Sequence, residues 1–87
     1  MKREGVYELI DGERYYQDKR WNPETTGSNG LHSAAEWLVY MQDYITEAIH
    51  IASRNPDPMA TDMAMANIRK VTAMGVAAME QIETQPR

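Results

Sequence analysis

The segment from Ser33 to Arg54, SAAEWLVYMQDYITEAIHIASR, constrains the fold most strongly. Its apolar residues recur at intervals of three and four, which is the pattern of a helix that buries one stripe of its surface. The residues of this stripe are Trp37, Met41, Tyr44, Ile45, Ala48, Ile51 and Ala52. Ser33 can cap the helix, and Glu36 three residues later completes a capping box. The sequence therefore predicts one long amphipathic helix over residues 34–54, which organises the rest of the chain.

A shorter helix is predicted over residues 6–20. Gly12 weakens this prediction, because a glycine inside a helix costs about 1 kcal/mol relative to alanine. The alternative is a helix that begins only at Asp11, which is a possible cap. The residues expected to share one side of this helix are Val6, Leu9, Ile10, Glu13, Tyr16 and Gln17.

A third helix is predicted over residues 58–83, after Pro56 ends the central one. Asp57 suits its cap and Pro58 suits its first position. Alanine and methionine dominate the segment, so this helix is apolar on most sides and is expected to be surrounded by protein. Three helices in so small a chain cannot surround it. We therefore expect part of its surface to contact another subunit, with Gly75 allowing close approach.

Together these segments predict an all-α fold with a single domain over residues 1–87. The protomer is expected to contain one shorter N-terminal helix and two long antiparallel helices, with a loop over residues 21–32, and to assemble into an oligomeric helical bundle. The chain has 87 residues and no cysteine, so it can build only a small core and no disulfide. Association with further copies is the usual remaining source of stability.

The net charge of the chain limits the kinds of partner that it is expected to bind. Nine basic and 13 acidic residues give a formal net charge of −4, which argues against general nucleic-acid binding. That balance leaves room for a local basic pocket that holds a small anionic ligand. The N-terminal residues precede no apolar run and no segment is long enough to span a membrane, so we expect a soluble cytoplasmic protein without a membrane partner.

Carboxylates recur along one face of the central segment at Glu36, Asp43 and Glu47. Mg²⁺ prefers carboxylate oxygens and takes one or two of them together with waters and substrate phosphates. The row could thus hold a metal beside a nucleotide, or it could be a solvated helix face. Glu36 also has its alternative role in the cap.

Two groups of cations could bind phosphate. Lys19 and Arg20 precede Trp21, with Arg14 earlier on the same helix, and arginine with a flat indole suits a phosphate and a nucleobase. The alternative is that Trp21 covers the core and the cations solvate the helix end.

Arg69 and Lys70 form the second group, in a helix that is otherwise almost uncharged. They can either pair with the carboxylates of the central helix or bind an anionic ligand, and the sequence does not separate these two roles.

Several chemistries find no support in the sequence. His32 and His50 are the only imidazoles and lack a second histidine at metal-ligand spacing, so a zinc site is not expected. Neither a cysteine nucleophile nor a serine in a triad context is present. Residues 27–30 do not match the glycine-rich phosphate loop.

Scattered positions between about residues 11 and 83 resemble a known family. They are Glu13-Arg14-x-x-Gln17-Asp18-x-x-Trp21, His32-Ser33-x-x-Glu36-Trp37, Glu47-Ala48, Arg69-Lys70-Val71 and Met79-Glu80-Gln81. This pattern resembles small phage and prophage proteins related to the all-α MazG-like nucleoside triphosphate pyrophosphohydrolases. The resemblance implies an oligomeric helical fold in which carboxylates hold Mg²⁺ and a nucleotide binds between helices.

The chain departs from the catalytic members of that family, which carry ExxE on one helix and ExxD on the next. Val39 follows Glu36 by three residues and Thr46 follows Asp43 by three, while the next helix offers Arg69 and Lys70. Cations in place of acidic ligands repel a metal but neutralise phosphates.

We therefore expect a non-catalytic, phage-encoded protein that binds or sequesters a small nucleotide, which in a phage setting could be a cyclic signal of host immunity. No cofactor is required for this binding. The expected ligand residues are Arg14, Gln17, Lys19, Arg20, Trp21, His32, Tyr40, Arg69 and Lys70, and the expected metal ligands are Glu36, Asp43 and Glu47. The first alternative is a Mg²⁺-dependent pyrophosphohydrolase, and the second is a helical module that binds another protein.

Overall fold

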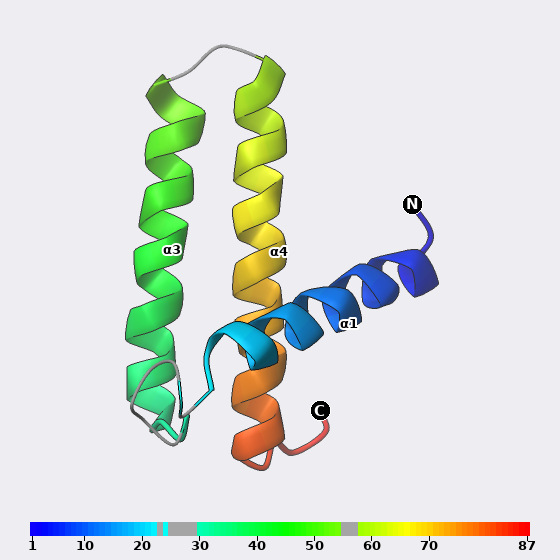
Figure 1. Ribbon diagram of the computed structural model, residues 1–87, viewed down its shortest axis with the longest axis vertical. Helices are drawn as coiled ribbons and strands as arrows, with labels where there is room; N and C mark the ends of the chain where they lie inside the picture. Colours follow the sequence, from blue (N-terminus) through cyan, green and yellow to red (C-terminus); the bar gives the residue numbers. More distant parts are fainter. Residues whose placement is uncertain (23, 25–29, 55–57) are drawn as a thin grey trace.

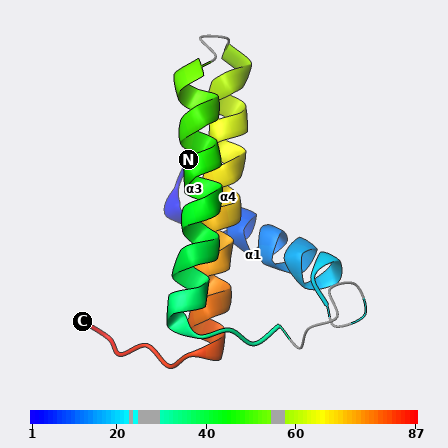
Figure 2. The ribbon, with the colours of Figure 1, turned by 90° about the vertical axis from the view of Figure 1, so that its left-hand side faces the viewer.

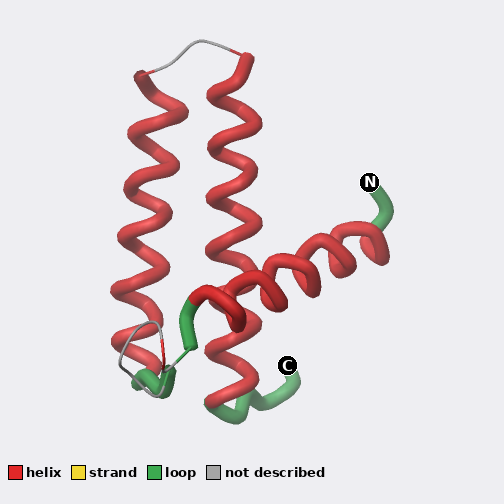
Figure 3. The backbone as a smooth tube through the Cα atoms, viewed as in Figure 1, coloured by secondary structure: helices red, strands yellow, loops and turns green. Residues whose placement is uncertain are grey.

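The computed structural model describes residues 1–22, 24, 30–54 and 58–87. Its elements are α1 (Arg3–Arg20), α3 (Ala34–Arg54) and α4 (Pro58–Gln81). Figure 3 shows that the described chain is helix and loop, with no strand among these residues. The predicted all-α class and the three helices of the protomer are therefore confirmed.

Helices α3 and α4 run antiparallel side by side, and α1 crosses the lower half of α4 (Figure 1). Figure 2, turned by 90°, shows α1 leaving the α3–α4 pair at an angle. Thus α4 packs against both other helices. The prediction that the segment 34–54 organises the chain is wrong in this respect, because the Ala- and Met-rich helix occupies the centre, where small side chains let two neighbours approach.

The helix ends follow local signals closely. The capping box is confirmed: the Ser33 backbone N–H donates to Glu36 Oε1 at 2.9 Å, and the Glu36 N–H donates to Ser33 Oγ at 3.2 Å. Helix α4 begins at Pro58 as expected and ends at Gln81, two residues before the predicted end. The expected cap at Asp57 and half of the predicted loop, residues 23 and 25–29, lie outside the described residues.

Helix α1 is longer than the predicted helix over 6–20, because it begins at Arg3. A start at Asp11 is wrong, since the helix continues through Gly12 without a break. Burial explains why: Ile10, Glu13 and Gln17 recur at helical spacing on the face that meets α4, and this contact offsets the cost of the glycine.

The α3–α4 contact is mainly apolar. Trp37, Met74 and Ala77 form its buried cluster, with Trp21, Met41, Tyr44 and Ala78 packed around them. Two residues of the predicted stripe, Ile45 and Ala52, are exposed instead. A helix that packs against one neighbour buries only a narrow seam, so the outer edge of the predicted stripe stays in solvent.

The α1–α4 contact is polar. Arg69 Nε donates to Glu13 Oε1 at 2.8 Å, and Gln17 Nε2 donates to the Lys70 carbonyl at 3.1 Å. The side chain of Glu13 is only 8% exposed. Of the two roles that the sequence leaves open for Arg69, pairing with carboxylates of the central helix is wrong as to the partner, because the crossing helix α1 supplies the carboxylate. Val6, Leu9 and Tyr16, which were expected to share one side of this helix with Ile10, Glu13 and Gln17, are exposed.

Much apolar surface remains uncovered on the two long helices. Leu38, Ile45 and Ile49 on α3 and Met59, Met63, Met65, Ile68 and Met79 on α4 are each at least 45% exposed. Even so, none of the described helices combines the length and the hydropathy that a membrane span requires.

Candidate functional site

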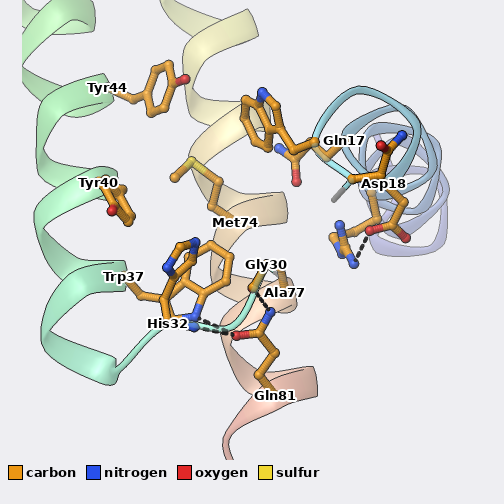
Figure 4. A pocket seen from close by; sticks show the side chains of 13 residues that line it. Gln17, Asp18, Gly30, His32, Trp37, Tyr40, Tyr44, Met74, Ala77 and Gln81 are labelled. Carbon is orange, nitrogen blue, oxygen red and sulfur yellow. Dashed lines mark hydrogen bonds and ion pairs between the residues drawn. The ribbon is translucent and has the colours of Figure 1, made fainter. Parts of the chain in front are cut away.

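A cavity of about 550 Å³ opens where α1, α3 and α4 meet (Figure 4). We call it the aromatic cavity, because two tryptophans, two tyrosines and a histidine line it. Its residues are Arg14, Gln17, Asp18, Trp21, Asn22, Gly30, His32, Trp37, Tyr40, Tyr44, Met74, Ala77 and Gln81. This volume lies within the usual range for small-molecule sites, roughly 300–1,000 Å³.

The aromatic rings form two groups along the cavity. Near the start of α3, the His32 ring packs edge-on against Trp37 and Tyr40, with centroids 5.2 and 5.1 Å away. Farther along, Trp21 from the end of α1 and Tyr44 from α3 face each other at 6.4 Å with their planes tilted by 33°. Rings from both ends of the cavity thus present apolar faces on which a flat heteroaromatic ligand could stack.

Gln81 at the end of α4 orders the first of these groups. Its Oε1 accepts from the Trp37 indole N–H at 3.0 Å and from the His32 backbone N–H at 3.3 Å, and its Nε2 donates to the Gly30 carbonyl at 2.6 Å (Figure 4). Gly30 adopts a positive φ of 74°, a conformation that glycine adopts without strain. One amide side chain therefore fixes both the loop end and the Trp37 ring.

Arg14 lies in the aromatic cavity, but its charge is already compensated. Its Nε and Nη2 donate to Glu80, at 2.9 and 3.2 Å, and Nη2 also donates to Asp18 at 2.9 Å. The hydrogen bond to Glu80 raises the pKa of Arg14, and the same contact lowers the pKa of the Glu80 carboxyl. A phosphate placed at Arg14 would meet two carboxylates, so the predicted phosphate-binding role of this residue is not favoured here.

A second cavity of about 590 Å³ lies beside the first, and we call it the cationic cavity. Its residues are Glu13, Tyr16, Arg20, Trp21, Tyr44, Ala66, Asn67, Arg69 and Lys70. The Lys70 ammonium lies 4.7 Å from the centroid of the Tyr44 ring, within the range of a cation–π contact. Trp21 and Tyr44 line both cavities, and we call these two shared side chains the Trp21–Tyr44 wall.

The structure sorts the predicted ligand residues into these two places. Five of them line the aromatic cavity, namely Arg14, Gln17, Trp21, His32 and Tyr40. Trp21 recurs in the cationic cavity together with Arg20, Arg69 and Lys70. Lys19 lines neither, since its ammonium lies over the Tyr15 ring at 4.4 Å. Trp37, Tyr44 and Gln81 were missed as site residues, because the helical pattern marks the first two only as core and gives no signal for the third.

The acidic row of α3 does not gather into a site. Glu36, Asp43 and Glu47 are all exposed, and Glu36 is engaged in the capping box. The Ser33 N–H that donates to Glu36 lowers the pKa of that carboxyl. Within the part of the chain that the structure describes, no three His, Cys, Asp or Glu side chains are close enough to hold a metal ion together. The metal role stays a prediction that this geometry does not favour.

Comparisons with protein-family models, with curated protein sequences and with solved structures gave no match. The resemblance to MazG-like proteins therefore stays a prediction. What the geometry offers chemically is an aromatic compartment with a neutralised arginine, next to a compartment that is rich in cations.

Proposed function

We propose that this protein binds a nucleotide without hydrolysing it, with the base held in the aromatic cavity. The observation that carries the proposal is the convergence of Trp21, Trp37, Tyr40 and Tyr44 on one cavity of nucleotide size. Stacking of a base on an aromatic side chain contributes roughly 1–3 kcal/mol and tolerates any base, because every base has a π face. Asp18 also lines this cavity and accepts from Arg14 through Oδ1, so its second carboxylate oxygen can accept from the edge of a stacked base.

Binding is favoured over hydrolysis by the distribution of carboxylates. Magnesium-assisted attack on a phosphate needs ligands that hold the metal and orient a water. The carboxylates nearest the cavities, Glu13, Asp18 and Glu80, are each paired with an arginine. We therefore keep the hydrolase as the less favoured alternative, and Mg²⁺ enters only with it.

Self-association is part of the proposal. The exposed apolar residues of α3 and α4 form surface that a monomer leaves in contact with water. A second copy of the chain is the occupant we propose for it, as the size of the core also favours. Sedimentation of the purified protein at the mass of one chain, across micromolar concentrations, would contradict this part and favour a partner protein instead.

The phage setting and the sequestering role also belong to the proposal, because the sequence resemblance alone suggests them. A protein that captures a nucleotide signal needs to retain the ligand intact and needs no turnover. The cytoplasm of a host cell is the compartment in which such a role makes sense.

The test uses the two tryptophans of the chain, both of which line the aromatic cavity. Titration with mono-, di- and cyclic nucleotides, with Mg²⁺ and with a chelator, should change the tryptophan fluorescence equally in both conditions. A ligand at 100 times its dissociation constant should also add about 2.7 kcal/mol to the free energy of unfolding. Analysis of the recovered ligand should show it unchanged.

A matched pair of variants locates the effect. Tyr40→Ala removes a ring of the aromatic cavity, whereas Tyr15→Ala removes an exposed tyrosine that lines neither cavity. We expect weaker binding in the first variant and unchanged binding in the second. A panel without any fluorescence or stability change, or equal losses in both variants, would contradict the proposal.

A further inference from the structure

We propose that the cationic cavity is the phosphate compartment of the nucleotide site, so that the ligand lies across the Trp21–Tyr44 wall with its base on one side and its phosphate on the other. This inference rests on the proposed function and deepens it. It assigns the anion to Arg20, Arg69 and Lys70 rather than to Arg14, which the sequence pattern favours equally.

The two cavities differ in the charge of the side chains that line them. The lining of the cationic cavity contains three basic side chains and one acidic side chain, in a protein whose formal net charge is −4. In the aromatic cavity the one arginine is held between Asp18 and Glu80. An anion is therefore attracted to the first compartment and repelled from the carboxylates of the second.

Arg69 keeps N–H groups with which it can bind an anion. Glu13 Oε1 accepts from Arg69 Nε at 2.8 Å, and in the described residues this is the hydrogen bond that the Arg69 guanidinium makes. An arginine has five N–H donors in a planar fork, so the Nη groups can still bind phosphate oxygens. The Arg69 side chain is 47% exposed, which keeps these groups within reach of a ligand.

Lys70 adds a further cation to the cationic cavity, next to the Tyr44 ring. Its ammonium lies over the Tyr44 ring, and the same ring lines the aromatic cavity in which the base is proposed to lie. An ammonium has three donors and a π face satisfies the charge only in part. A phosphate at Lys70 and a base beside Tyr44 would therefore belong to one ligand.

The two cavities meet at the Trp21–Tyr44 wall. Trp21 and Tyr44 are shared by both cavities and lie 6.4 Å apart between ring centroids. The ligand class that fits is a nucleoside phosphate in which a flat base and an anionic group are separated by a sugar. A free nucleoside would fill one compartment only.

The test compares nucleosides, their 5′-monophosphates and inorganic phosphate by isothermal titration calorimetry on the chain of residues 1–87. We expect a monophosphate to bind at least about tenfold more tightly than its nucleoside, with the gain falling as salt rises, because exposed charges are screened. Lys70→Gln and Arg20→Gln should each lower this gain, measured as the ratio of the nucleoside and monophosphate dissociation constants of the same variant.

Lys19→Gln is the matched control, because Lys19 also lies over a tyrosine ring but lines neither cavity. It should keep the full gain, and circular dichroism should show that all variants fold. Equal affinity for nucleoside and monophosphate, or a gain that survives both cavity variants, would overturn the inference and leave the base site standing.

The remaining outcomes separate the two proposals. Binding of inorganic phosphate that Lys70→Gln abolishes, without any binding of nucleosides, would support the phosphate compartment and contradict the base site. Absence of binding for all three ligand types would overturn both.

Discussion

The two helix contacts of this small protein differ in the kind of side chain that forms them. Helices α3 and α4 meet through Trp37, Met74 and Ala77, an apolar cluster without charge. Helices α1 and α4 meet through an ion pair between the buried Glu13 and the partly exposed Arg69, and through an amide donated to a backbone carbonyl. Apolar contacts stabilise in proportion to the area that they remove from water, whereas buried polar contacts depend on the partner being present.

Residues of both contacts line the cavities. Trp37, Met74 and Ala77 of the apolar cluster line the aromatic cavity, and Glu13 and Arg69 of the polar contact line the cationic cavity. Helix α1 brings Trp21 toward the α3–α4 pair, and this side chain lines both cavities. The α3–α4 pair thus serves as the rigid base, and α1 supplies one wall of each compartment.

The largest expected loss of stability follows from a substitution at the apolar α3–α4 contact. Met74 is 3% exposed, so Met74→Ala should lower the free energy of unfolding by about 2–5 kcal/mol through lost burial and a residual cavity. Met79→Ala, on the same helix but 56% exposed, is the control and should change it by less than about 0.5 kcal/mol. Urea unfolding measures both, and equal losses would contradict the assignment of the core.

An intermediate effect is expected at the polar contact. Arg69→Met leaves the buried Glu13 carboxylate without its partner, which should cost about 1–3 kcal/mol. Adding Glu13→Gln should recover part of that loss, because a neutral amide is easier to bury than a charge. A double-mutant cycle by urea unfolding measures the coupling. Strictly additive losses would show that the pair does not connect α1 to α4.

The smallest effect on stability is expected at the Arg14–Glu80 pair, where the arginine lowers the pKa of the Glu80 carboxyl from its ordinary value of 4.5. Because the folded pKa is the lower one, the contribution is present above pH 4.5 and is lost as the pH falls through the lowered value. Glu80→Gln should therefore destabilise the protein by less than about 1 kcal/mol at pH 7 and by less still at pH 3. Unfolding at both pH values checks this, with the exposed Glu83→Gln as control. An equal loss at both values would contradict it.

Much of the fold can be predicted from local patterns. Apolar spacing predicts all three helices, and the Ser33–Glu36 capping box and Pro58 mark two helix starts that the structure confirms. The helix that occupies the centre could not be predicted in the same way. Helical periodicity shows which side of a helix is buried, but it does not show how many neighbours cover that side.

The same limit applies to the site. Arg69 is recognisable as a cation that needs a partner, yet its spacing says nothing about whether α3 or α1 supplies the carboxylate. Tyr44 belongs to the apolar stripe, and the stripe cannot show that its ring lines two cavities. Gln81 is one polar residue near a helix end, and its role depends on three contacts that exist only in the folded chain.

The most direct test of the central claim is equilibrium dialysis of the purified protein against a mixture of nucleosides and nucleotides, followed by mass spectrometry of what the protein side retains after denaturation. Binding without hydrolysis predicts enrichment of an intact nucleotide over its nucleoside, with and without Mg²⁺. Equal concentrations on both sides of the membrane, or recovery of a hydrolysed product only when Mg²⁺ is present, would contradict it.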